Sequence, residues 1–295
     1  MFEYQHKNPK NELKTTYGSI RIRNIIFEPE EIEKALPDIV FDDENLKHMF
    51  AEDYLDDFKK RKIYRRFVPK TKTQLELEDF IDKSISSNAS FYSFLAEGIL
   101  GLIFRDLYDY RLAKGIIDVN DTLNDSHTGV DACMYDLKNN IVILGEAKFY
   151  SSLYSGINKI IEDFTKKSIK NKLESLQTAT ENCFETSRII IKNLGSDVYD
   201  ELTVDQFMNQ TIIFAGFVLH SETNVSEYGN SDFYDIYDLS VQALTANIKK
   251  SLNGGELRGK YEIIMVHLPV SNKKSLIAKI IEKSHSELHR LGGNV

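Results

Sequence analysis

The chain has 295 residues, of which 42% are hydrophobic and 28% are charged, and its formal net charge at pH 7 is −8. This composition is ordinary for a globular protein with a sizeable core, and the negative net charge argues against a protein that coats nucleic acid by charge alone. The N-terminus, MFEYQHKNPKNELK, has no apolar signal region, and no stretch reaches the ~18 apolar residues of a membrane-spanning helix. We therefore expect a cytoplasmic protein with no membrane partner.

Residues 1–70 are expected to form a small N-terminal α/β region. They combine a strand-like piece at 18–27 with an acidic segment at 42–57, which changes sign at 59–66. The basic segment is compatible with contact to a DNA backbone or to an acidic partner, although a solvated helix face is the simpler interpretation. Polar residues after Pro69 indicate a connector, so we place a boundary near residue 71.

Residues 71–295 have a more regular pattern, which predicts an α/β domain. Helices are expected at about 73–86, 89–109, 152–168, 169–192, 203–208, 239–252 and 273–290. Strands are expected at 129–136, 140–149, 211–219 and 261–268. Lys138 and Asn139 would join the first two strands as a hairpin. This order predicts a mixed β-sheet flanked by helices on both faces.

The candidate site lies where the second hairpin strand ends. An apolar run at 141–144 is followed by Gly-Glu-Ala-Lys, which puts Glu146 and Lys148 where a buried strand would continue. With a two-residue turn, Asp131 lies opposite Glu146, and strand alternation keeps both on the face of Lys148. Two carboxylates this close repel each other unless a cation lies between them, and a hard ion such as Mg²⁺ binds carboxylates, carbonyls and water. We therefore expect a divalent metal site, with the Lys148 amine beside it to orient or polarise an attacking water.

Glu97 is a candidate third acidic member of this site. It is the only charged residue in the apolar segment 94–104. A buried carboxylate without a partner is costly, so we expect Glu97 to face the metal or its water. The alternative is a structural ion pair of Lys148 with Glu146 or Asp131, because such pairs also occur at the ends of sheets. The residues alone leave both interpretations open.

These residues resemble the PD-(D/E)XK nuclease superfamily, whose core is a helix, a hairpin, a helix and a strand. The superfamily motif corresponds to Glu97 on the helix, Asp131 on one strand and Glu146-Ala147-Lys148 on the next. The proline that precedes the first Asp in the superfamily is replaced by Val130. More specifically, FLAEGILGLIFRDLY, HTGVDACMYD and ILGEAKFY are similar to the HamA family, the nuclease subunits of the Hachiman anti-phage defence system.

The resemblance implies a restriction-endonuclease-like core and a Mg²⁺-dependent deoxyribonuclease that acts on DNA with a HamB-like helicase as its partner. It implies that Mg²⁺ is bound by the carboxylates of Asp131 and Glu146 and by the carbonyl of Ala147. Lys148 would position the water and stabilise charge on the phosphate, and Glu97 would assist the metal or its water. Residues 1–70 would then be a partner-binding or accessory region.

Several further residues are candidates for contact with substrate. A helix after the hairpin is expected to flank the site, and its basic residues would contact phosphates. These residues are Lys166, Lys167, Lys170 and Lys172, and Gln177 further along would extend the site. His127, near the start of the Asp131 strand, is a candidate for contact with a substrate phosphate, although a turn histidine is the simpler interpretation. His220 and His267 lack carboxylate or Cys spacing and are expected to be hydrogen-bonded residues within the sheet.

A second hypothesis is a non-catalytic subunit that keeps the nuclease fold and binds a helicase through its N-terminal region. The intact set of Asp131, Glu146 and Lys148 favours the enzyme. Cleavage of DNA in the presence of Mg²⁺ distinguishes the two hypotheses.

Overall fold

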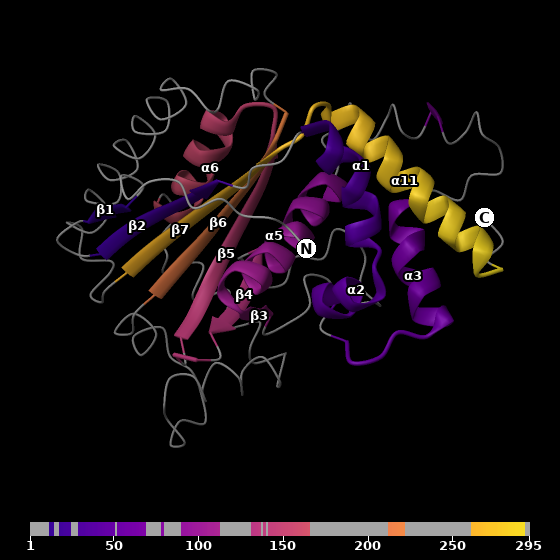
Figure 1. Cartoon of the computed structure of the whole chain (residues 1–295), viewed down its shortest axis with the longest axis horizontal. Helices are drawn as coiled ribbons and strands as arrows, with labels where there is room; N and C mark the ends of the chain where they lie inside the picture. Colours follow the sequence, from indigo (N-terminus) through magenta and orange to yellow (C-terminus); the bar gives the residue numbers. More distant parts are fainter. Residues whose placement is uncertain are drawn as a thin grey trace.

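The computed structural model describes residues 12–14, 18–24, 29–50, 52–68, 78–79, 90–112, 131–136, 138–139, 141–165, 212–221 and 261–292. Over these ranges the chain forms a seven-stranded mixed sheet with helices on both faces (Figure 1). The predicted α/β class with a mixed, helix-flanked sheet is therefore confirmed. None of the helices in the described ranges is long and apolar enough to cross a membrane.

The strands of the sheet come from widely separated parts of the chain. They are β1 (Glu12–Lys14), β2 (Gly18–Asn24), β3 (Tyr110–Leu112), β4 (Ala132–Asp136), β5 (Ile141–Tyr150), β6 (Ile212–His220) and β7 (Tyr261–Pro269). Their order across the sheet is β1-β2-β7-β6-β5-β4-β3. The central strands β2, β7, β6 and β5 are parallel, whereas β1, β4 and β3 pair antiparallel with their neighbours.

From residue 89 onward, the helices of the described residues agree with the sequence pattern. They are α1 (Pro29–Val40), α2 (Asp43–Phe50), α3 (Asp57–Phe67), α5 (Ser90–Tyr108), α6 (Leu153–Thr165) and α11 (Lys273–Arg290). The helices predicted at 89–109, 152–168 and 273–290 correspond to α5, α6 and α11. The sequence-based prediction assigns no helix to the residues of α1 and α2; Pro37 inside α1 is atypical of a helix interior. The helices predicted at 169–192, 203–208 and 239–252 lie outside the described residues, as does the helix predicted at 73–86 except for residues 78–79.

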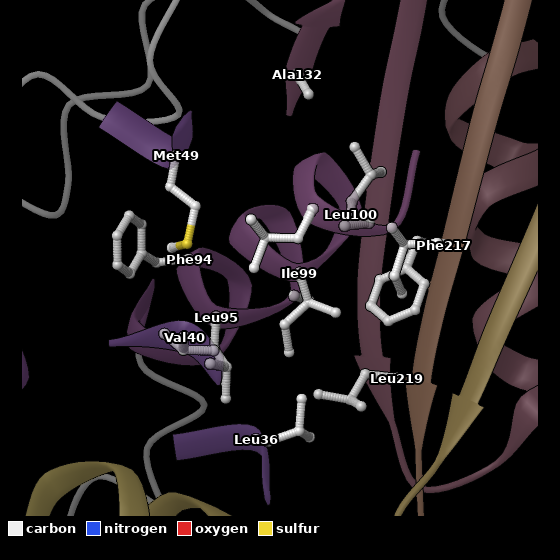
Figure 2. Close-up of a cluster of buried hydrophobic side chains, with 14 of the residues drawn as sticks. Leu36, Val40, Met49, Phe94, Leu95, Ile99, Leu100, Ala132, Phe217 and Leu219 are labelled. Carbon is white, nitrogen blue, oxygen red and sulfur yellow. The ribbon is translucent and has the colours of Figure 1, made fainter. Parts of the chain in front are cut away.

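Helix α5 packs across one face of the sheet and forms the centre of the core. Figure 2 shows Ile99 and Leu100 of α5 lying between the N-terminal helices and Phe217 of β6; all three side chains are fully buried. Burial of each such side chain contributes about 1.5–3 kcal/mol to stability. Helix α2 comes close to α5 because residue 98 is glycine, where a Cβ atom would lie 2.4 Å from Cε of Met49.

The N-terminal helices and β2 share this sheet and core with the rest of the chain. Strand β2 pairs with β7, and α1 and α3 pack against α11. The buried carboxylate of Glu33 in α1 accepts hydrogen bonds from the Asn272 N–H group and from Lys279 Nζ, both at 3.0 Å. The boundary near residue 71 remains a prediction, since residues 69–77 lie outside the described ranges.

Helix α6 covers the opposite face of the sheet, over β5 and β6 (Figure 1). Two glycines allow the helix to approach closely. A Cβ atom at Gly156 of α6 would lie 2.5 Å from Cγ1 of Val218, and one at Gly216 of β6 would lie 3.2 Å from Cγ2 of Ile160. Side chains of α6 near its C-terminal end can therefore reach groups on the surface of the sheet.

Two buried histidines form a pair on neighbouring strands. Nε2 of His220 in β6 lies 3.1 Å from Nδ1 of His267 in β7. Strand alternation places both on the same face as Val218, which α6 covers. Burial lowers the pKa of His267 to about 4, and burial together with the neighbouring His267 lowers the pKa of His220 well below its usual value. Both rings are therefore neutral at pH 7, as expected for hydrogen-bonded residues within a sheet.

We expect acid to destabilise the fold through this pair. The pKa of an unfolded histidine is about 6.5, whereas that of the folded His267 is about 4. Between these values the unfolded state binds more protons, so the free energy of unfolding falls as the pH drops, by about 2 kcal/mol at about pH 5 for one such histidine. Chemical denaturation at neutral and acid pH measures this loss. His267→Gln should reduce the pH dependence, whereas His289→Gln, at an exposed position of α11, should retain it. Equal pH dependence in His267→Gln and the wild type would contradict the assignment.

Candidate functional site

The β4–β5 hairpin has the predicted register. The ladder pairs Ala132 with Gly145 and Asp136 with Ile141. Asp136 closes the turn, because its Oδ1 accepts hydrogen bonds from the N–H groups of Lys138 and Asn139 at 2.8 and 3.1 Å. A turn stabilised in this way fixes which residues of β4 face the end of β5.

Asp131 lies where the regular ladder ends, and it is bonded to β5 through both its backbone and its side chain. Its N–H group donates to the carbonyl of Gly145 at 3.1 Å. Its Oδ2 accepts a hydrogen bond of 2.8 Å from the N–H group of Ala147. The carboxylate of Asp131 is therefore fixed beside the backbone between Glu146 and Lys148.

The amine of Lys148 lies among three carboxylates. Its Nζ is 3.0 Å from Oδ2 of Asp163, 3.1 Å from Oε2 of Glu146 and 3.5 Å from Oδ2 of Asp131. Burial alone lowers the pKa of Lys148, but the negative charges of Asp131 and Asp163 outweigh this effect and the pKa is raised. The amine is therefore a cation at neutral pH, and it holds together side chains from β5, α6 and the start of β4.

Glu97 of α5 belongs to the same electrostatic group. Burial and the negative charge of Asp131 raise the pKa of Glu97 to about 8, although the positive charge of Lys148 acts in the opposite direction. Glu97 is therefore mostly protonated at pH 7 in the metal-free protein. Of the residues predicted for this site, Asp131, Glu146, Ala147 and Lys148 lie in contact, and Glu97 interacts electrostatically with two of them.

The donor set fits a hard divalent cation in its chemistry. Asp131 and Glu146 both reach the Lys148 amine, so their carboxylates already approach one common cation. Burial and, after it, the negative charge of Asp131 raise the pKa of Glu97, so a cation bound beside Asp131 would offset part of this effect. No group of three or more His, Cys, Asp and Glu side chains in the described ranges is arranged to hold a metal ion. The predicted Mg²⁺ site does not require three such side chains, since it consists of two carboxylates and one backbone carbonyl.

Of the segments predicted to contact substrate, the structure describes only the basic segment at 59–66. The candidates Lys166, Lys167, Lys170, Lys172, Gln177 and His127 fall outside the described residues. The basic segment at 59–66 is part of α3, where Lys59 pairs with Glu52 and Lys60 with Asp43, each at 2.5 Å. Carboxylates of the same chain therefore neutralise part of the positive charge of this segment.

Asp163 is a residue of this cluster that the sequence pattern did not identify. It lies on α6 three residues after Ile160, on the stripe formed by Leu153, Gly156 and Ile160, which are all buried. The available signal was a carboxylate at a position where the helical spacing calls for an apolar residue. That signal is weak, because the final turn of a surface helix often carries charge.

Comparison with known proteins supplies the family. A family model for HamA matches residues 4–284, which includes the hairpin, α5, α6 and nearly all of the rest of the chain. No curated protein matches the chain. The chain therefore belongs to the HamA family, and this membership associates it with Hachiman defence.

Proposed function

We propose that this chain is a Mg²⁺-dependent deoxyribonuclease, which hydrolyses phosphodiester bonds of DNA together with a helicase subunit in Hachiman defence. The observation that carries the proposal is the cluster at the end of the hairpin. Asp131, Glu146 and Lys148 meet there through contacts of 3.1 and 3.5 Å, in a member of the HamA family.

In this proposal the carboxylates of Asp131 and Glu146 and the carbonyl of Ala147 hold Mg²⁺. A bound Mg²⁺ ion would polarise the phosphate and lower the pKa of a coordinated water. The Lys148 amine would orient the attacking water and stabilise the negative charge that develops on the phosphate oxygens. Glu97 would assist the metal or its water, since its carboxyl group lies within the same electrostatic cluster.

Contacts to DNA outside the cluster are proposed for Lys166, Lys167 and Lys170, because these three lysines directly follow α6 in the chain. Contacts of this kind bind phosphates and position the duplex, and they carry no sequence information. They would weaken with salt, so the affinity for DNA should fall as ionic strength rises.

One observation favours the second candidate function, a non-catalytic subunit that binds and regulates a helicase. The Lys148 amine is already paired with three carboxylates, and such a cluster is also stable as a structural ion pair. In that case the chain would bind its helicase without cutting DNA.

We expect the purified protein, alone or with its helicase, to nick or degrade plasmid DNA when Mg²⁺ is present. Chelation of the metal should stop cleavage and addition of Mg²⁺ should restore it, because the acidic pair has no other role in hydrolysis than to hold the cation. Gel electrophoresis of supercoiled plasmid measures the reaction. Lys138→Ala, which alters an exposed lysine in the hairpin turn, serves as a control that should cut normally. Helicase binding without cleavage under any of these conditions would favour the non-catalytic subunit.

A further inference from the structure

Asp163 provides the carboxylate closest to the Lys148 amine. Its Oδ2 lies 3.0 Å from Nζ, compared with 3.1 Å for Glu146 and 3.5 Å for Asp131. The side chains of Lys148 and Asp163 are only 17% and 23% exposed, so water screens their attraction less than on an open surface. Glu146 and Asp131 belong to the hairpin region, whereas Asp163 comes from a helix on the face of the sheet.

The second oxygen of Asp163 is also held in place. Its Oδ1 lies 3.0 Å from Nζ of Lys159, which is one turn earlier on α6. Because both oxygens are engaged by lysines, the carboxylate has a defined orientation that directs Oδ2 toward Lys148. Ion pairs to both oxygens restrict the rotamers of Asp163 and of the two lysines that it contacts.

The position of α6 on the sheet makes this contact possible. Gly156 and Gly216 allow the helix to lie close to β6, and Ile160 fills the space above Gly216. Asp163 follows Ile160 by three residues, so it lies on the same side of the helix. From there its short side chain reaches the Lys148 amine directly.

We propose that Asp163 is a positioning residue that holds the Lys148 amine in place for the reaction. This inference rests on the proposed nuclease function. Asp131 and Glu146 are the carboxylates assigned to Mg²⁺, so a bound cation would compete with Lys148 for them. Asp163 is not in that set, and it retains the amine when the other two carboxylates are engaged. Loss of Asp163 therefore affects the placement of the amine and leaves DNA binding intact.

Steady-state kinetics of Mg²⁺-dependent cleavage test this role. Asp163→Ala should lower kcat by roughly 10–100-fold, the scale expected when a catalytic group is misplaced by about 1 Å, with little change in KM. Asp163→Asn should restore part of kcat, since its side-chain carbonyl still accepts a hydrogen bond from the amine. Glu162→Gln is a matched control, because it removes a neighbouring carboxylate that also pairs with Lys159, at 3.6 Å. Wild-type kcat in Asp163→Ala would overturn the proposal.

Nuclear magnetic resonance of the ¹⁵N-labelled lysine ammonium groups gives a second measurement, without DNA. The Lys148 signal, assigned with Lys148→Met, should persist in the wild type at saturating Mg²⁺ and broaden in Asp163→Ala. An unchanged Lys148 signal in Asp163→Ala would overturn the proposal even if activity fell, because the loss of activity would then have a cause other than displacement of the amine. If the wild type cuts no DNA, the nuclease function fails separately, and this signal still decides whether Asp163 holds the amine.

Discussion

Replacing Lys148 with alanine is expected to reduce Mg²⁺-dependent DNA cleavage by roughly 10²–10³-fold, as for the loss of one group that stabilises transition-state charge. The amine contacts carboxylates on β5, on α6 and on the residue before β4, so its position is specific. Single-turnover cleavage of labelled DNA measures the effect on the chemical step. Lys138→Ala provides the matched control, since it removes a lysine from the exposed turn of the same hairpin.

The variant has a second expected property that separates catalysis from folding. Without the amine, Asp131, Glu146 and Asp163 repel one another, so the melting temperature should fall in the absence of metal. A divalent cation supplies the missing charge, and Mg²⁺ should therefore raise the melting temperature of Lys148→Ala. Cleavage at the wild-type rate by a folded Lys148→Ala protein would show that the amine has no part in the reaction.

Replacing Glu97 with glutamine is expected to stabilise the metal-free protein at alkaline pH. The folded pKa of Glu97 is about 8, whereas that of an unfolded glutamate is about 4.3. The folded state therefore binds more protons between these values, and the free energy of unfolding declines as the pH rises through this window. Each unit by which the folded pKa exceeds the unfolded pKa corresponds to about 1.4 kcal/mol. Ionised Glu97 therefore lowers the free energy of unfolding by several kcal/mol at about pH 9. Glutamine has the shape of the neutral acid and does not ionise.

Chemical denaturation with a chelator present, at about pH 5 and at about pH 9, measures this difference. Glu97→Gln should match the wild type more closely at the acid pH and exceed it at the alkaline pH. Saturating Mg²⁺ should narrow the gap, because a cation beside Asp131 removes part of the repulsion that raises the pKa of Glu97. Asp106→Asn, an exposed change on the same helix, should behave as the wild type at both values. A parallel pH dependence of Glu97→Gln and the wild type would exclude Glu97 from the cluster.

Local patterns predict the hairpin and its acidic face well. The turn at Lys138 and Asn139 sets the register, and alternation along β5 then places Glu146 and Lys148 together. These relations span fewer than about twenty residues and follow from strand geometry. Helix α5 and the special position of Glu97 could also be predicted from the sequence, because Glu97 interrupts a nearly continuous apolar run.

Long-range packing explains what the sequence did not reveal. The contact of Asp163 with Lys148 depends on the rotation of α6 and on the close approach at Gly156, and neither is encoded in a local pattern. The backbone bond from Ala147 to Asp131 arises where the ladder departs from its regular pairing. Helices α1 and α3 are similarly determined by packing against α11, which follows them by more than 200 residues.

The parallel pairing of β2 with β7 has a consequence for synthesis of the protein on the ribosome. Gly18 lies beside Tyr261 and Asn24 beside His267, so β2 cannot pair with β7 until residues 261–267 have been translated. The β4–β5 hairpin emerges much earlier and can form with α5 before its parallel neighbours exist. A nascent chain thus carries the acidic cluster on an unfinished scaffold with open strand edges, which are prone to aggregate unless a chaperone covers them.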